Sequence, residues 1–127
     1  MKKQQDYESI LDSISDGVFT VNDKWRITSF NHAAEIITGI PKEEALGKPC
    51  SEVLRSSLCG EECALRQTLE DGNPIINKAC YFISSQGNQV PITLSTAILK
   101  NSDGQVLGGA ETFRDISEIE SLKKKLS

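Results

Sequence analysis

The fold is decided at residues 27–39, which read ITSFNHAAEIITG. The first four residues are rich in β-branched and aromatic side chains, a composition typical of a strand. Asn31 comes next, and its short side chain can accept hydrogen bonds from the free N–H groups of a first helical turn. Gly39 suits the left-handed residue that ends a helix. The stretch therefore predicts a strand that passes directly into a helix, which Asn31 caps and which ends at residue 37 or 38.

A hairpin and a further helix are predicted on the N-terminal side of this stretch. Residues 18–21 fit a short strand, residues 22–24 a turn, and residues 25–30 the returning strand. Ahead of the hairpin, apolar side chains recur at the i, i+3, i+4 and i+7 spacing of one helical face. These side chains are Tyr7, Ile10, Leu11 and Ile14. We expect residues 1–15 to form an N-terminal flanking helix.

Short helices and three longer strands are predicted on the C-terminal side. Pro41 can open a helix over residues 42–46. Residues 50–62 fit one helical turn followed by a loop, and residues 63–70 fit a longer helix that ends at the sequence Asp-Gly-Asn-Pro. Beyond this helix the apolar pattern changes to the period of two that is typical of strands. The predicted strands are residues 75–84, 89–99 and 105–113, separated by polar turns.

The order of these elements predicts an α+β fold. Two strands precede the helices and three follow. A five-stranded antiparallel sheet with the short helices on one face is the simplest arrangement that buries the apolar sides of the strands and of the helices. We expect residues 16–115 to form this domain. Residues 116–127 then begin a C-terminal helix, in which three apolar side chains have the a–d–a spacing of a coiled coil. They are Ile119, Leu122 and Leu126.

The composition excludes several classes of protein. The chain has 127 residues, of which 38% are hydrophobic and 25% charged, so it is neither a disordered tail nor a fibrous repeat. Its net charge of −4 argues against nucleic acid or an anionic membrane as a partner. No apolar run approaches the roughly 18 residues that a membrane helix needs, and no signal peptide opens the chain. We therefore expect a cytoplasmic location, where cysteines are thiols or ligands rather than disulfides.

Five segments resemble the motifs of the PAS sensor family, in the same order and with similar spacing. They are DGVFTVN at residues 16–22, ITSFNHAAE at 27–35, TG and EEALGK within 38–48, GNQVPI at 87–92, and DIS at 115–117. The resemblance spans about residues 7–126. The sequence is similar in particular to the PAS domains of sigma-54-dependent transcriptional activators and of sensor histidine kinases.

The resemblance implies a sensory or interaction module of a bacterial-type signalling protein. Such a module binds a small ligand or a partner, forms a homodimer through its flanking helices, and passes a change to an output domain through its C-terminal helix. A second hypothesis is a dimerisation scaffold that binds no ligand. An enzyme is not expected, because His32 is the only histidine and no catalytic set of side chains occurs at a suitable spacing.

Asp115, Ile116 and Ser117 are expected to join the last strand to the C-terminal helix. As the N-cap, or as the residue before it, Asp115 would hold the first helical turn and complement the helix dipole. Loss of such a cap costs about 1 kcal/mol. Ordinary helix capping and a joint that transmits a signal are both compatible with this sequence.

Apolar residues at strand and helix spacing can line a ligand pocket between the sheet and the helices, or can pack as an ordinary core. Few polar side chains among them could orient a ligand. The candidate lining residues are Ile36, Ile37, Leu54, Leu65, Leu69, Tyr81, Ile92, Leu94 and Phe113.

Three cysteines gather near the short helices with the spacing C-x8-C-x3-C. They are Cys50, Cys59 and Cys63, and Cys80 follows in the third predicted strand. Thiolates in this number can bind an iron–sulfur cluster or Zn²⁺. Alternatively, Cys59 and Cys63 can form a reversible disulfide, or the small side chains pack the helical layer. A redox or iron–sulfur sensor is therefore a third hypothesis.

The resemblance disfavours flavin and haem as cofactors. Photosensory relatives have a reactive cysteine at the place of Cys50, but the residues around it differ here. Phe113 stands where those relatives have the glutamine that contacts the flavin. Haem-binding relatives place their ligand on the helix at residues 63–70, which contains no histidine in this chain. We expect His32 to be an ordinary surface histidine.

Overall fold

The computed structural model describes residues 9–10, 12–53, 55–56 and 63–126. The backbone at residues 9–10 and 12–13 is helical, within the range of the predicted N-terminal helix. Two residues of its predicted apolar stripe, Tyr7 and Leu11, lie outside the described residues. The other two, Ile10 and Ile14, have exposed side chains.

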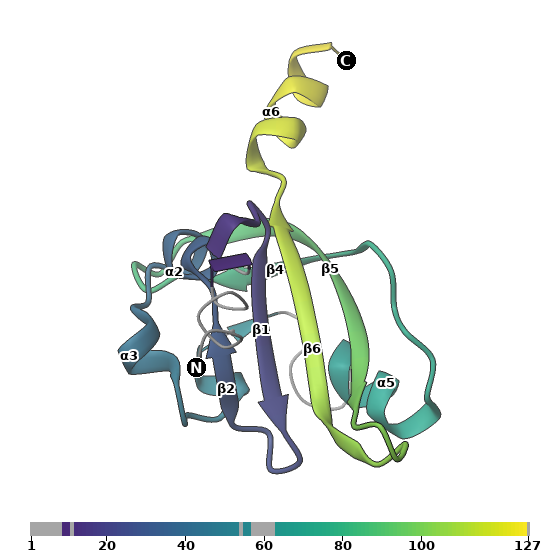
Figure 1. Cartoon of the computed structure of the whole chain (residues 1–127). Helices are drawn as coiled ribbons and strands as arrows, with labels where there is room; N and C mark the ends of the chain where they lie inside the picture. Colours follow the sequence, from purple (N-terminus) through teal and green to yellow (C-terminus); the bar gives the residue numbers. More distant parts are fainter. Residues whose placement is uncertain (1–8, 11, 54, 57–62, 127) are drawn as a thin grey trace.

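The sheet contains the five predicted strands, which are labelled in Figure 1, and one short additional strand. All neighbouring strands are antiparallel, in the spatial order β2-β1-β6-β5-β4-β3. The strands are β1 (Gly17–Asn22), β2 (Ile27–Phe30), β3 (Arg55–Ser56), β4 (Lys78–Ile83), β5 (Gln89–Lys100) and β6 (Val106–Asp115). The predicted α+β fold is confirmed. Strand β3, which pairs with the end of β4, was not predicted, because two residues are too few to show a period.

Among the helices of the described residues, four contribute side chains to the core and a fifth leaves the domain. They are α2 (His32–Thr38), α3 (Lys42–Ala45), α4 (Cys50–Val53), α5 (Ala64–Asp71) and α6 (Ser117–Leu126). Each of α2 to α5 buries at least one residue, whereas α6 buries none and projects away from the sheet (Figure 1). Helix α5 confirms the helix predicted at residues 63–70, and Gly72, with a left-handed φ of 79°, ends it.

Strand β4 begins at Lys78, three residues later than the sequence predicts. Asn77 has a left-handed φ of 53°, a conformation that interrupts an extended strand. Ile75, ahead of this break, still pairs with β5. Its N–H donates to Thr96 Oγ1 at 2.9 Å, and its carbonyl accepts from the Thr96 N–H at 2.8 Å. Asn77 thus interrupts the extended backbone, but the pairing with β5 and the alternation of apolar side chains continue on both sides of it.

Three phenylalanine rings form the centre of the core. Phe19, Phe82 and Phe113 come from β1, β4 and β6, and each is at most 2% exposed. The Phe113 ring centroid lies 6.2 Å from that of Phe19 and 6.3 Å from that of Phe82. Tilted and edge-on contacts of this kind stabilise a core beyond simple burial. One residue of β6 thus packs against aromatic side chains from two other strands.

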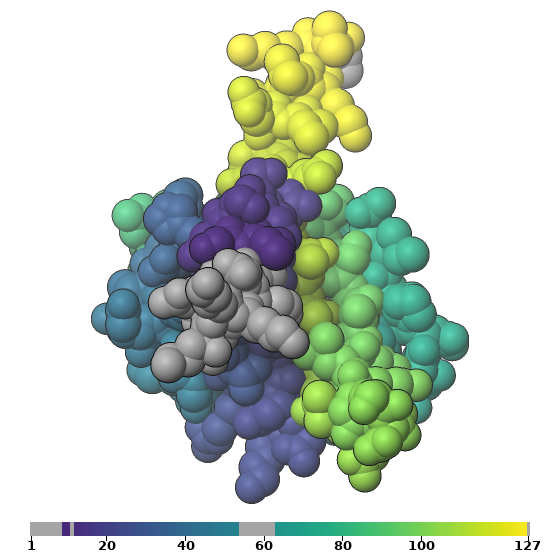
Figure 2. Space-filling model, in the orientation of Figure 1, coloured from purple at the N-terminus to yellow at the C-terminus, as the bar shows by residue number. Residues whose placement is uncertain are grey.

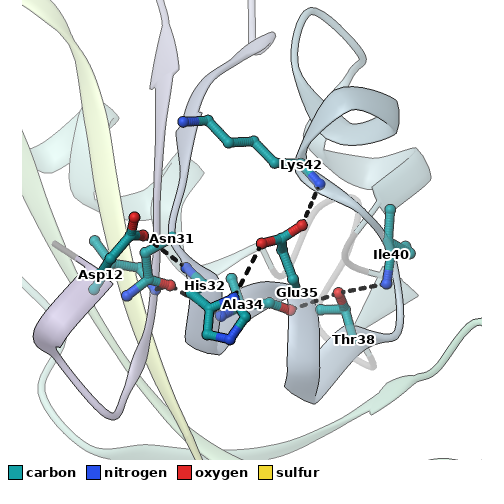
Figure 3. Close-up of polar contacts among 9 residues, drawn as sticks. Asp12, Asn31, His32, Ala34, Glu35, Thr38, Ile40 and Lys42 are labelled. Atoms are coloured by element: carbon teal, nitrogen blue, oxygen red, sulfur yellow. Dashed lines mark hydrogen bonds and ion pairs between the residues drawn. The ribbon is translucent and has the colours of Figure 1, made fainter. Parts of the chain in front are cut away.

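Asn31 connects α2 to the first strand, and Figure 3 shows its contact with the helix. Its Oδ1 accepts hydrogen bonds from the N–H groups of Ala34 and Val18, both at 2.9 Å. Its Nδ2 donates to the carbonyl of Asp16 at 3.0 Å. Because Asn31 is only 2% exposed, water cannot replace these bonds. The predicted cap is confirmed, and it also holds β1.

Side chains also tie the end of α2 to the start of α3 (Figure 3). Thr38 Oγ1 donates to the carbonyl of Ala34 at 2.6 Å, and Glu35 Oε2 accepts from the N–H of Lys42 at 2.8 Å. His32, at the start of α2, is exposed and its Nδ1 lies 3.3 Å from Glu35 Oε1, as expected of a surface histidine. The short helices are thus held by their own polar side chains as well as by the core.

We expect Asn31→Ala to lower the free energy of unfolding by about 2–3 kcal/mol, because it removes the cap and deprives the buried N–H of Val18 of its acceptor. Urea denaturation followed by circular dichroism measures the change. Ile36→Ala, at an exposed position of the same helix, is the control and should cost less than about 0.5 kcal/mol. Equal losses in the two variants would show that Asn31 does not hold this connection.

Candidate functional site

The candidate site is the face of β6 that is turned toward the helices. Along this strand Gly109, Glu111 and Phe113 are buried, whereas Thr112 between the last two is exposed. A Cβ atom at Gly109 would lie 2.7 Å from Leu65 Cδ1, so this face of the strand lies directly against α5. A larger residue at this position would require the Leu65 side chain to shift.

Glu111 lies at the centre of this face. In the antiparallel register its neighbours are Phe19 on β1 and Thr96 on β5. Thr96 Oγ1 accepts from the N–H of Ile75 and shares a hydrogen bond with Thr68 Oγ1 of α5. Glu111, Thr96 and Thr68 are each at most 5% exposed. Three polar side chains are therefore enclosed in an apolar core.

The carboxyl group of Glu111 differs from the two hydroxyls, because one of its oxygens is left unpaired. Among the buried side-chain nitrogens and oxygens of the described residues, only Glu111 Oε2 has no hydrogen-bond partner. Removal from water disfavours the charged form of a carboxyl group. Burial therefore raises the pKa of Glu111 from 4.5 to about 8, and the group is mostly neutral at pH 7.

Most of the candidate pocket residues lie in or beside the core. Leu65, Ile92, Leu94 and Phe113 are buried in it, and Ile37 and Leu69 pack against it half-buried. Leu54 lies outside the described residues. This placement fits a pocket lining and a packed core equally well.

Two of the candidate pocket residues are turned away from the core, and their prediction was wrong. Ile36 is 69% exposed, because α2 buries Ala34 and Thr38 and the residue midway between them lies on the opposite side of the helix. Tyr81 is 48% exposed, because the residues before and after it on β4 face the core and strand side chains alternate.

Glu111 was not among the predicted pocket residues, although the sequence contains the signal for it. Strand side chains alternate, so the pattern that places Phe113 inside also places the residue two positions earlier inside. A glutamate is ordinarily assigned to the solvent face because it is almost never fully buried. Here the register of the strand overrides that preference.

The predicted signal joint is a compact set of hydrogen bonds. Asp115 Oδ1 accepts from the N–H of Ser117 at 2.8 Å and from its hydroxyl at 2.6 Å. The carbonyl of Ile116 accepts the first bond of the helix, from the N–H of Glu120 at 2.9 Å, so Asp115 is the residue before the N-cap. The N–H of Ile116 donates to the carbonyl of Pro91 at 3.0 Å, which ties the joint to β5.

The apolar stripe of α6 is exposed. Ile119, Leu122 and Leu126 are 46%, 55% and 88% exposed. Figure 2 shows α6 standing clear of the rest of the molecule. The orientation of α6 is therefore set by the joint rather than by packing against the domain.

The cysteines that the structure describes lie in or near the helical layer and the core. Cys50 and Cys63 are half-buried and pack against the core, and Cys80 is buried within it. Within the described residues, no three His, Cys, Asp or Glu side chains are placed to hold a metal ion. Cys59 lies outside the described residues, so its iron–sulfur or disulfide role stays a prediction.

A family model described as "PAS domain" matches residues 15–118, which is most of the chain.

The chain belongs to the PAS domain family.

Known relatives of this PAS domain include signalling proteins. It is 23% identical over 118 residues to the signal transduction histidine-protein kinase AtoS of Escherichia coli, covering 93% of this chain and 19% of AtoS. It is 25% identical over 116 residues to the transcriptional activator RocR of Bacillus subtilis, covering 91% of this chain and 25% of RocR. The chain thus spans about a fifth to a quarter of these relatives, so the domain resembles one part of larger proteins.

Solved structures support the fold. The crystal structure of the PAS domain of a protein from Colwellia psychrerythraea matches with a TM-score of 0.75 and 17% identity, covering 91% of this chain and 98% of that one. Across the described ranges, this PAS domain contains no helix with the length and apolar character that crossing a bilayer requires.

The stability of the PAS domain is expected to fall as the pH rises from about 5 to about 8. The pKa of Glu111 is about 8 in the fold against 4.5 for an ordinary glutamate, so in this range the folded chain holds one proton more than the unfolded chain. The contribution of Glu111 to the free energy of unfolding then decreases by about 1.4 kcal/mol per pH unit. It is constant below this range, where both states are protonated, and above it, where both are ionised.

Urea denaturation of the wild type and of Glu111→Gln across this pH range measures the effect, because the other titrating groups cancel in the difference. Glutamine keeps the size and neutrality of the protonated carboxyl group. A difference between the two proteins that does not change with pH would show that the buried carboxyl is not neutral.

Proposed function

We propose that this PAS domain is the cytoplasmic sensory module of a signal-transduction protein, in which it binds a small ligand or a partner and passes the change to an output domain through α6. The class proposed is that of a bacterial sensor histidine kinase or transcriptional regulator. The observation that carries the proposal is the course of β6. This strand buries Gly109, Glu111 and Phe113 in the core and ends at Asp115, where the joint to α6 begins.

The path from the core to α6 is short. Glu111 and Phe113 precede Asp115 by four and two residues on one continuous strand. On the other side of the joint, the hydrogen bond from Ile116 to Pro91 holds the start of β5. A movement of β6 relative to β5 in the core therefore changes the direction in which α6 leaves the sheet.

Signalling of this kind requires two arrangements of α6 whose populations a ligand shifts. The ligand must bind one arrangement more tightly than the other, because equal affinity shifts nothing. No residue of α6 is buried, so few contacts have to break when its orientation changes. The hydrogen bonds of Asp115 to Ser117 then determine how strongly the orientation of α6 is coupled to that of β6.

Homodimerisation through the flanking helices is part of the proposal. Ile119 and Leu122 are about half exposed and lie one turn apart on α6. A helix with such a stripe is stabilised when it pairs with a second helix. Two copies of the domain would then present their output domains side by side.

A scaffold that dimerises without binding a ligand is the second candidate, and the unpaired carboxyl group of Glu111 argues against it. A core built only for stability gains nothing from a buried acid without a partner. Thermal-shift screening together with light scattering separates the two candidates, since the scaffold forms dimers and binds no small molecule.

In the full-length protein, we expect Asp115→Ala to change the output activity several-fold while the stability of the domain falls by only about 1 kcal/mol, the usual cost of a lost cap. Asp115→Asn keeps an acceptor oxygen and should behave closer to the wild type. Asp103→Ala, in the exposed turn between β5 and β6, is the control. Unchanged output in Asp115→Ala would show that the joint does not transmit.

Replacing Leu122 by aspartate is expected to weaken self-association at least tenfold, because a charge then lies in the proposed helix pair. Sedimentation equilibrium measures the association constant. Leu107→Asp, at a similarly exposed position of β6, is the matched control and should associate like the wild type. Equal loss of association in both variants, or none in either, would place the dimer contact elsewhere.

A further inference from the structure

We propose that Glu111 is the anchor of a ligand site in the core, and that the ligand is a small organic cation with N–H donors, such as an amine, amidinium or guanidinium. This inference rests on the proposed sensory function and names the ligand class of that site. The geometry behind it is the position of the carboxyl group on β6, between Phe19 of β1 and Thr96 of β5 and facing the helices.

In its ionised form, the carboxyl group at this position would need a hydrogen-bond donor. Glu111 Oε2 is enclosed and accepts no hydrogen bond. The nearby hydroxyls of Thr96 and Thr68 hydrogen-bond to each other, and neither is paired with this oxygen. A ligand with N–H groups would satisfy the oxygen without rearranging the threonines.

The buried residues that the structure describes include no countercharge for this carboxyl group. Among the buried residues that the structure describes, Glu111 is the only one with an acidic or basic side chain. Its cross-strand neighbours are Phe19 and Thr96, and Leu65 of α5 lies against Gly109, two residues away on the same face; none of these three side chains titrates. An anionic ligand would meet the carboxyl group unfavourably, whereas a cationic ligand would pair with it away from water.

Aromatic rings complete a site for an organic cation. Phe19 lies beside Glu111 on the next strand, and Phe113 follows it on the same face of β6. The two ring centroids are 6.2 Å apart. Phenylalanine faces attract organic cations, and this attraction increases when water is excluded. A carboxyl group flanked by two rings therefore favours a cation that has an apolar or planar body.

Binding should release one proton. Before binding, the carboxyl group is mostly neutral at pH 7 because its pKa is about 8. When the cation binds, the proton of the carboxyl group passes to solvent and the resulting carboxylate pairs with the ligand. Ionising the group costs about tenfold in affinity for each pH unit below its pKa. Affinity for the cation should therefore rise about tenfold from pH 6 to pH 7 and level off above pH 8.

The test compares probes of different charge on wild type and Glu111→Gln. Benzamidine is the cationic probe, benzamide and benzoate are its neutral and anionic counterparts, and methylguanidine is a smaller cation for a narrower site. We expect the cations alone to stabilise the wild type in thermal-shift assays, with at least tenfold weaker binding to Glu111→Gln by calorimetry. Glu118→Gln, at an exposed position of α6, is the control and should bind like the wild type.

Two further readouts exclude a merely structural effect of the substitution. Calorimetry in buffers of different ionisation enthalpy should count one proton released per cation bound to the wild type. The infrared carbonyl band of the protonated carboxyl group should disappear on binding, and Glu111→Gln should lack this band from the start. Cation binding without proton release, or with equal strength in Glu111→Gln, would overturn the proposal.

The remaining outcomes separate this inference from the proposed function. If benzamide or benzoate binds wild type and Glu111→Gln alike, the core senses a ligand and the cation proposal is overturned. If none of the four probes binds at millimolar concentration, the cation proposal is overturned and the ligand-free scaffold is supported.

Discussion

Strand β6 hydrogen-bonds to β1 along one edge and to β5 along the other, and it runs without interruption into the joint with α6. The rest of the domain depends on this register. It sets Gly109 against α5, places the carboxyl group of Glu111 between Phe19 and Thr96, and packs Phe113 against two aromatic rings. A shift by one residue would turn all of these side chains to the other face of the sheet.

Much of this arrangement could be predicted because it is local. The capping bond of Asn31 spans only three residues of the chain, so the start of its helix can be predicted locally, and the five strands follow from the period of two. Ile36 and Tyr81 were wrongly predicted to line the pocket. Both are large hydrophobic residues, but which face of a helix or strand is buried depends on the elements that pack against it. The opposite holds for Glu111. A charged residue is expected at the solvent face, but the position of Glu111 on β6 places it in the core.

A buried carboxyl group without a partner lowers stability, and it remains in this core only because it can stay protonated. Groups of this kind concentrate at functional sites, where a protein gives up stability for binding or switching. The same strand that carries this group also carries Asp115, whose two hydrogen bonds hold the first turn of α6. The unpaired carboxyl group of the core and the exit from the domain are thus four residues apart.

A change in the protonation of the core carboxyl group should reach α6 through β6. Nuclear magnetic resonance of the Ile116 and Ser117 amide groups, recorded from pH 6 to pH 9, tests it without any ligand. We expect these signals in the wild type to move with a midpoint near the pKa of Glu111, about 8, and Glu111→Gln to abolish the transition. Amide signals that do not move in the wild type, or that move in the same way in the variant, would contradict it.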